Sequence, residues 1–298
     1  MGAMAVEAPV PRPVARALYE GFDYAAFWRD PARAHMDVLE HRLVERLLPR
    51  VGRRILDAGC GFGRLADVYV NRFDECVLVD SAWSLLEQAR DRWASHVTLV
   101  AADLRAMPFA TGAFDAALAV RVLHHFEDPR PVLAGLRAVL APGGRLLFTS
   151  SNARNPKRIL RALLGGEPWS PFRAGPISYD RHTFGWSAGE LRDLVTAAGF
   201  RVRELRGVGV LDKLVAHVGP VARLVPPGVG VSRPLGALRL APSLLGAAEV
   251  AGAGSVCPAP VLRCPACRVA LVAGDAVFDC PACLRAFPLV DGIWDFRL

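Results

Sequence analysis

The sequence predicts an α/β protein in which a doubly wound, mostly parallel sheet of seven strands precedes a small cysteine-rich module. Three observations lead to this prediction. Apolar runs of strand length alternate with segments of helical spacing between residues 53 and 150. The first run ends at a glycine-rich turn, Asp57-Ala-Gly-Cys-Gly-Phe-Gly63, and two pairs of cysteines lie close to the C-terminus. Strands that alternate with helices favour parallel pairing, because the crossover helices cover the sheet.

The expected elements follow one another in regular order. The expected strands cover residues 53–58, 75–80, 97–103, 113–120, 144–150 and 200–208. The expected helices cover residues 64–72, 83–93, about 130–140 and 187–198. The third of these helices ends at Pro142-Gly143-Gly144, which is a typical helix stop. The seventh strand is harder to place, and we expect it within residues 245–256.

Length and composition indicate one large domain with an appendage. The chain has 298 residues, of which 52% are hydrophobic, so it can bury a sizeable core. We expect a helical lid over residues 1–50, a main domain over 51–256 and a C-terminal module over 257–298, with 209–244 as an insertion that covers a substrate. No run of about 18 apolar residues occurs, so we expect no membrane-spanning segment. The start of the chain is not of the secretory type, and cysteines without an export signal predict a cytoplasmic protein.

The net charge of +7 arises in one part of the chain. Residues 151–256 carry 14 basic and 7 acidic side chains, whereas the remaining segments are balanced. Lys213 to Ala248 contains no carboxylate and is rich in Leu, Val, Pro and Gly. A basic and apolar segment of this kind could contact an anionic substrate, a lipid surface or RNA phosphates. It could equally be an apolar lid with solvated arginines.

Polar side chains stand where the expected strands end. Asp57, Asp80, Asp103 and Arg121 follow the first four strands, and ligands of such sheets bind beyond these carboxyl ends. An acidic residue in the place of Asp80 can accept hydrogen bonds from both ribose hydroxyls, and Asp103 can accept one from an adenine amino group. The glycines between Asp57 and the first helix allow the backbone to approach a ligand closely.

The glycines are 59, 61 and 63, and this GxGxG spacing differs from the GxGxxG dinucleotide fingerprint. Over about residues 15–205 the chain resembles the class I S-adenosylmethionine-dependent methyltransferases, in ILDAGCGFGRLA, VLVDSAW, AADLRAMPFATGAFDAALAV and WSAGELRDLVTAAGF. LHHFEDP followed by LAPGG is similar to the branch with ubiquinone and menaquinone biosynthesis methyltransferases. The resemblance implies a Rossmann-like sheet and S-adenosylmethionine as cofactor.

The resemblance also implies which residues bind the cofactor. They are Asp57, Ala58, Gly59, Gly61, Gly63, Asp80, Ser81, Asp103, Leu104 and Arg121. The N-terminal segment is dense in aromatic residues, and related enzymes close over the cofactor with such a segment. We therefore add Tyr24 as a cofactor contact and Arg33 as a lid contact, although an aromatic stripe is more often core.

Methyl transfer asks the protein mainly to hold the reactants in line and to exclude water. A general base is needed only when the nucleophile must lose a proton. His124 and His125 follow the fourth strand and are the candidates for this role. The alternative is that one histidine packs against the cofactor and shapes the loop. Tyr179 and His182 either line the substrate mouth or pack within their loop.

The two cysteine pairs, Cys264-Pro-Ala-Cys267 and Cys280-Pro-Ala-Cys283, are typical of a four-thiolate zinc ribbon. Four thiolates leave no open position on the ion, so the Zn²⁺ would be structural. The tail Phe287-Pro-Leu-Val-Asp-Gly-Ile293 also resembles the small zinc-ribbon partners that activate RNA and protein-factor methyltransferases. Reduced cysteines without a metal are the alternative.

Three functions remain open from the sequence. The leading one is methyl transfer to an oxygen, carbon or nitrogen atom of a small, lipophilic molecule, which the quinone-type resemblance and the apolar 209–244 segment favour. The second is RNA methylation through the basic 151–256 region, although few aromatic residues accompany its arginines. The third is a non-catalytic domain that binds the cofactor and recruits a protein partner through the ribbon. Peripheral contact with a membrane is compatible with the first.

Overall fold

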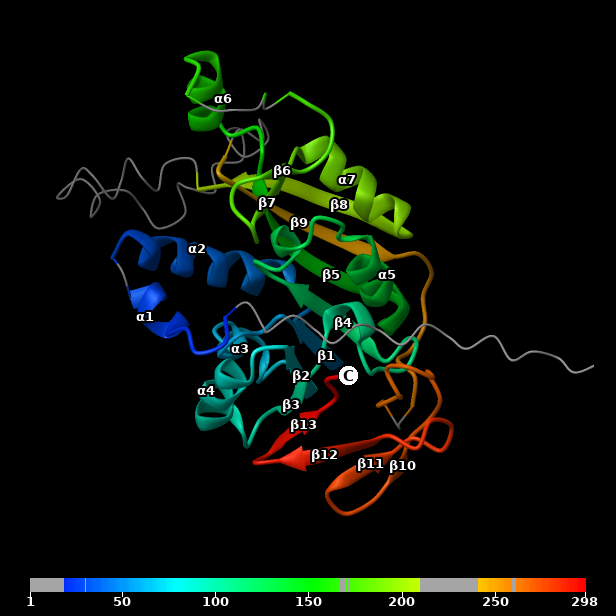
Figure 1. Ribbon diagram of the computed structural model, residues 1–298. Coiled ribbons are helices and arrows are strands. Elements are labelled where there is room, and N and C mark those ends of the chain that lie inside the picture. The colour runs from blue at the N-terminus through cyan, green and yellow to red at the C-terminus, as the bar shows by residue number, and fades with distance from the viewer. Residues whose placement is uncertain (1–18, 30, 167–169, 171, 210–240, 259–260) are drawn as a thin grey trace, which may run out of the picture.

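A computed structural model describes residues 19–29, 31–166, 170, 172–209, 241–258 and 261–298. A central sheet lies between two sets of helices, and the C-terminal strands continue it at one edge (Figure 1). No helix among the described residues is long and apolar enough to cross a membrane. Most of the expected cover, residues 210–240, lies outside the described residues.

Five parallel strands form the centre of the sheet in the order β3-β2-β1-β4-β5. They are β1 (Gly52–Ala58), β2 (Phe73–Asp80), β3 (Thr98–Ala101), β4 (Phe114–Ala119) and β5 (Leu140–Asn152). Two antiparallel strands follow beside β5, first β9 (Ser243–Val250) and then β8 (Phe200–Val208). The prediction of a mostly parallel Rossmann-like α/β sheet is confirmed.

Successive side chains of each strand point to opposite faces of the sheet, and helices cover both faces, so both are buried. Leu56 and Leu146 pack with α5 (Arg130–Val139) and α7 (Ala188–Ala197) on one face. Their neighbours Ile55 and Leu147 pack on the other face. That second face is covered by α2 (Pro31–Leu47), α3 (Ala66–Tyr69) and α4 (Trp83–Trp93). The short helix α1 (Tyr24–Arg29) lies beside α2, whereas α6 (Pro156–Leu163) stands apart from the body of the molecule.

The expected count of seven strands is wrong, because the described residues form one mixed, hydrogen-bonded sheet of 13 strands. Two short strands, β6 (Ile177–Ser178) and β7 (Phe184–Trp186), extend the far end of β5. The other four come from the C-terminal segment: β10 (Val272–Ala273), β11 (Val277–Asp279), β12 (Ala286–Val290) and β13 (Ile293–Asp295). Without the C-terminal strands, β3 would be an edge strand with unpaired backbone groups. These groups pair with β13, which adds the C-terminal strands to the sheet.

The C-terminal module, residues 257–298, attaches to that edge. β13 pairs in parallel with β3, and Phe296 N donates to Ala101 O at 2.8 Å. Ile293 is fully buried among the side chains of the main core. Arg268 adds two hydrogen bonds, to Met107 O at 2.6 Å and Phe109 O at 3.3 Å. The module thus shares a sheet and a core with the rest of the chain, and the domain boundary at residue 257 stays a prediction.

Candidate active site

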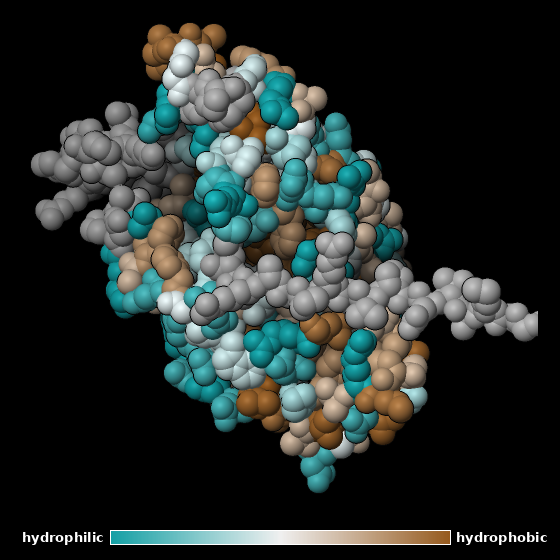
Figure 2. Space-filling view, viewed as in Figure 1, coloured by the Kyte–Doolittle hydropathy of each residue, from teal (hydrophilic) through white to brown (hydrophobic). Residues whose placement is uncertain are grey.

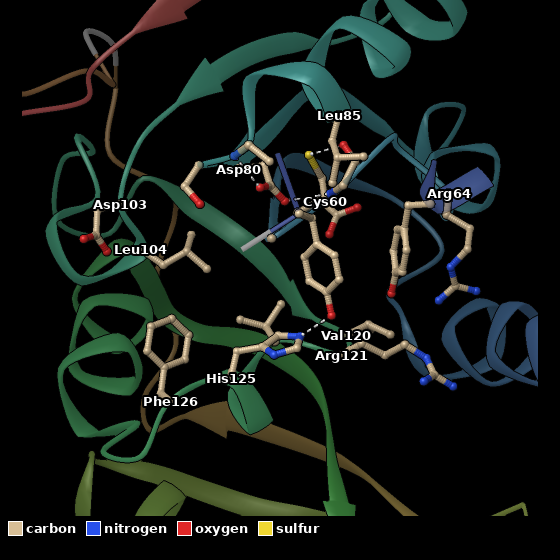
Figure 3. A pocket seen from close by; sticks show the side chains of 18 of the residues that line it. Cys60, Arg64, Asp80, Leu85, Asp103, Leu104, Val120, Arg121, His125 and Phe126 are labelled. Atoms are coloured by element: carbon tan, nitrogen blue, oxygen red, sulfur yellow. Dashed lines mark hydrogen bonds between the residues drawn. The ribbon is translucent and has the colours of Figure 1, made fainter. Parts of the chain in front are cut away.

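A cavity of about 280 Å³ opens at the carboxyl ends of the parallel strands. Asp103 lies toward one end, and Arg64 and Arg121 lie toward the other (Figure 3). Asp80 lies between these ends, and His125 and Phe126 line the side opposite to Asp80. The cavity thus has polar side chains at both ends, at the edge of the sheet where doubly wound proteins bind ligands.

The turn from β1 to α3 requires glycine at specific positions. Gly59, Gly61 and Gly63 have φ values of 76°, 56° and 70°, in the left-handed region that other residues rarely adopt. A Cβ atom on Gly59 would lie 2.4 Å from Val122 Cγ2, and one on Gly63 would lie 2.8 Å from the Trp93 ring. The turn therefore packs its backbone directly against neighbouring side chains.

Asp80 ties this turn to the next strand. Its carboxylate accepts hydrogen bonds from Gly61 N and Ala82 N, both at 2.9 Å. Burial raises the pKa of this carboxyl, and the backbone N–H groups oppose that rise. Each carboxylate oxygen can accept a second hydrogen bond, so Asp80 can still bind hydroxyl donors in the cavity.

Asp57 is buried beneath the same turn and accepts a hydrogen bond from the Tyr69 hydroxyl at 2.7 Å. Burial raises the pKa of Asp57 to about 6, and the bond from Tyr69 opposes the rise. Asp57 thus joins the end of β1 to Tyr69 of α3 and also lines the cavity.

Asp103 already has a partner that the sequence analysis missed. Its carboxylate accepts from Arg105 N at 2.8 Å and pairs with the Arg105 guanidinium at 2.5 to 3.0 Å. The first bond caps the short helical turn Leu104–Ala106. Arg105 also lines the cavity, so this end presents a carboxylate that is partly neutralised.

The opposite end contains two arginines that share one carboxylate. Glu40 of α2 is buried and pairs with Arg64 at 2.6 Å and with Arg121 at 2.9 Å. The Trp28 ring contacts both guanidiniums, with its centroid 4.0 Å from Arg64 Cζ and 4.6 Å from Arg121 Cζ. Arg64 also pairs with Asp37 of α2, so the two guanidiniums are balanced by two carboxylates at this end of the cavity. Sequence reasoning identified Arg121 but missed Arg64, whose position directly after Gly63 was a usable signal.

The N-terminal aromatic segment reaches over the cavity at His125. Tyr19 Oη lies 3.1 Å from His125 Nε2, and His125 Nδ1 lies 3.0 Å from His182 O. A carbonyl oxygen only accepts, so Nδ1 carries the proton and Nε2 accepts from the Tyr19 hydroxyl. Burial lowers the pKa of His125, and burial raises the pKa of Tyr19 to about 12. Both side chains are therefore neutral near pH 7.

The structure separates the two candidate histidines. His125 lines the cavity, whereas His124 is absent from its lining. His124 Nδ1 is buried without a hydrogen-bond partner among the described groups, and burial holds the pKa of His124 well below its usual range.

The other predicted residues also divide. Asp57, Gly59, Gly61, Asp80, Ser81, Asp103, Leu104, Arg121 and Tyr24 line the cavity, and Ala58 and Gly63 do not. Arg33 lies over the Phe27 ring, 3.8 Å from its centroid, and is not part of the lining. His182 lines the cavity. Tyr179 is not part of the lining, and Arg158 Cζ lies 3.4 Å from the centroid of its ring.

The four cysteines of the C-terminal module converge away from this cavity. The sulfurs of Cys264, Cys267, Cys280 and Cys283 lie within 4.8 Å of one another. Cys264 Sγ and Cys283 Sγ are 3.8 Å apart, close to the roughly 3.8 Å between thiolates at about 2.3 Å from one tetrahedral ion. Cys267 N and Cys283 N donate to the first sulfur of their own pair at 3.4 and 3.5 Å. This donor set fits a tetrahedral metal, and Cys257 is not part of it.

Comparison with known proteins identifies the family. A family model described as a methyltransferase domain matches residues 56–148. The chain is 30% identical over 203 residues to the O-methyltransferase resE of Aspergillus sclerotiorum, over 63% of this chain and 72% of that protein. It is 30% identical over 212 residues to the O-methyltransferase rstn1 of Aspergillus nomiae, over 66% of this chain and 88% of that protein. The chain belongs to the S-adenosylmethionine-dependent methyltransferases.

The fold agrees with this assignment. An S-adenosylmethionine-dependent methyltransferase from Mesorhizobium loti superimposes with a TM-score of 0.55 at 22% identity, over 71% of this chain and 97% of that one. In this methyltransferase the matched residues run from β1 to β5 and include the glycine turn, Asp80, Asp103 and His125. The C-terminal module lies outside the match to the methyltransferase domain.

Proposed function

We propose that this methyltransferase transfers a methyl group to the hydroxyl oxygen of a small, lipophilic molecule, such as a phenol or an enol. The observation that carries the proposal concerns His125 in the cavity wall. Its imidazole is neutral, and its Nε2 accepts a hydrogen bond from the phenolic hydroxyl of the Tyr19 side chain. The names of the two fungal relatives, both O-methyltransferases, support the same chemistry. No observation on the described residues favours RNA methylation or a purely partner-recruiting role.

The lining of the cavity fits S-adenosylmethionine. When bound, this cofactor supplies an electrophilic methyl group on a sulfonium centre. Asp80 would accept from the ribose hydroxyls, while Ser81, Asp103 and Leu104 would surround the adenine. Arg64 and Arg121 line the cavity, and their guanidinium N–H groups would donate to the carboxylate of the methionyl part. The close backbone approach at Gly59 and Gly61 leaves room beneath the ligand, and Tyr24 would cover it.

His125 would act as the general base. The bond from Nδ1 to the His182 carbonyl fixes the ring and its tautomer, so that the Nε2 lone pair faces the cavity. A substrate hydroxyl that took the place of the Tyr19 hydroxyl would donate to Nε2 in the same way and pass its proton to that nitrogen. The lowered pKa keeps His125 unprotonated and ready to accept this proton near pH 7.

The test is methyl transfer to a panel of phenols of pKa near 10 with His125→Gln, compared with Tyr19→Phe. We expect His125→Gln to lower kcat/KM by about 10²- to 10⁴-fold and to remove the acidic limb of its pH profile. Cofactor affinity, measured by calorimetry, should change little. Tyr19→Phe should retain the acidic limb, because it leaves the base intact. Wild-type rates in His125→Gln would refute the role of His125, and methylation of amines alone would refute the hydroxyl substrate.

We also propose that the C-terminal module, residues 257–298, is a zinc ribbon that forms a domain of its own beside the methyltransferase domain of residues 51–256. The convergence of the four cysteine sulfurs supports the binding of a zinc ion. Four thiolate ligands would leave no open coordination position on that ion, which supports a structural role. Zinc analysis of the purified protein tests this, and an absence of bound metal under reducing conditions would contradict it.

A further inference from the structure

The helix α6 exposes its apolar residues to solvent. None of its residues is buried, and Leu160, Leu163 and the following Leu164 have exposed fractions of 57%, 73% and 77%. A surface helix of a globular protein ordinarily turns such residues to the core. The apolar residues of α5, which are Val132, Leu133, Leu136 and Val139, are fully buried, as expected. α6 therefore has an apolar side that the described part of the chain leaves largely uncovered.

The side chains of α6 are sorted by chemistry. Leu160, Leu163 and Leu164 are spaced three and four residues apart and so share one face. Lys157 and Arg161 are also four residues apart, and each lies three residues before a leucine, so this basic pair flanks the leucines along one side. Residues 153–166 contain four basic side chains and no acidic one. Apolar side chains flanked by basic ones, with no acidic residue among them, are typical of helices that lie in the surface of a membrane.

The start of α6 is fastened to the fold. Asn155 caps the helix, with its Oδ1 accepting from Arg158 N at 3.1 Å. Its Nδ2 donates to Asn152 O, at the end of β5, at 3.0 Å. The helix therefore leaves the sheet in a set direction and stands out from the body of the molecule (Figure 1). Figure 2 shows an apolar cluster at this outer end.

We propose that α6, together with Leu164, docks this methyltransferase on the surface of an anionic lipid bilayer. The three leucines enter the boundary between headgroups and acyl chains, while Lys157 and Arg161 contact lipid phosphates. No described helix could span a bilayer, so the contact is peripheral. A second copy of the chain is a poorer occupant, because a twofold contact would bring the basic residues of two α6 helices together.

The position of α6 gives this docking a consequence. α6 follows the carboxyl end of β5, and the cavity opens at the carboxyl ends of the strands parallel to β5. Docking would thus hold that end of the sheet near the bilayer, where a lipophilic substrate is concentrated. This consequence rests on the proposed function, whereas the docking itself does not.

The experiment is co-sedimentation of the full chain with vesicles, without cofactor or substrate. Vesicles with phosphatidylglycerol are compared with vesicles of phosphatidylcholine alone. The test variant carries Leu160→Ser, Leu163→Ser and Leu164→Ser. The control carries Val51→Ser and Leu284→Ser, because these apolar side chains are exposed even more fully, at 79% and 85%, outside α6 and outside the other helices and strands. Binding needs no turnover, so its outcome is independent of the proposed reaction.

We expect the wild type and the control to bind the anionic vesicles, and the triple variant to bind at least about tenfold more weakly. Lys157→Ser should weaken binding by about fivefold at low salt, which corresponds to about 1 kcal/mol per basic residue at the surface. Equal binding of the triple variant and the wild type would overturn the proposal. So would an absence of binding by the wild type, or a lipid-independent dimer that the triple variant loses.

Discussion

Replacement of Gly59 by alanine should destabilise the protein through two separate effects. The first is backbone strain, because φ of Gly59 is +76°, where a Cβ atom is disfavoured. The second is a steric overlap, because the new Cβ would lie 2.4 Å from Val122 Cγ2. Gly165→Ala isolates the first effect, since Gly165 has φ of +70° and nothing within 4 Å of its Cβ position.

The expected magnitudes follow from these two contributions. Backbone strain alone costs roughly 1–2 kcal/mol, which is the expected loss for Gly165→Ala. The overlap with Val122, a buried residue, adds about 1–3 kcal/mol. Gly59→Ala should therefore lower the free energy of unfolding by about 2–5 kcal/mol. Val122→Ala removes the clashing methyl groups, so the two substitutions should show a favourable coupling of about 1–3 kcal/mol.

Urea unfolding of Gly59→Ala, Gly165→Ala, Val122→Ala and the Gly59→Ala/Val122→Ala pair measures each quantity. Cofactor affinity by calorimetry gives a second readout, and Gly59→Ala should weaken it because the turn must shift. The reasoning is refuted if Gly59→Ala and Gly165→Ala lose the same stability, or if the cycle with Val122→Ala shows no coupling. Either result would mean that the turn does not pack against Val122 as the structure has it.

Three further predictions concern charge and metal. Cys280→Ser should reduce the zinc content from about one ion per chain and lower the melting temperature of the whole protein, because β13 pairs with β3 and Ile293 is buried in the main core. Asp57→Asn should flatten the pH dependence of stability between about 4 and 6. The pKa of Asp57 is raised from 3.8 to about 6 in the fold, so the wild type loses stability as pH rises through this window, by about 3 kcal/mol at most. Unfolding at pH 4 and pH 7 checks it, and a parallel loss in the variant would contradict it. Glu40→Ala should lower the free energy of unfolding by about 3–5 kcal/mol, because it leaves Arg121 without its carboxylate partner and Arg64 with Asp37 alone. Urea unfolding measures this loss, and Glu45→Ala on the exposed side of α2 is the control.

The elements of the fold could be predicted because their signals are local. The periodicity of apolar residues placed α4 at Trp83–Trp93 and β8 at Phe200–Val208, with the same bounds as the sequence analysis. The strand-end residues Asp57 and Asp80 also meet at one cavity, because parallel strands of one sheet bring their carboxyl ends to the same edge. The spacing of the cysteines likewise foretold their convergence.

The sequence by itself thus determined the parallel sheet, the glycine turn and the four-cysteine cluster, since each depends on residues close together or on a regular period. Only the tertiary structure decided that Tyr19 bonds to His125, 106 positions away, and that His124 does not reach the cavity. It also decided that Glu40 joins Arg64 to Arg121, and that β13 continues the sheet at β3. These contacts have no local pattern. Glu40 looks like any acid of an exposed helix until packing buries it, and an edge strand accepts a partner through backbone groups that every sequence shares.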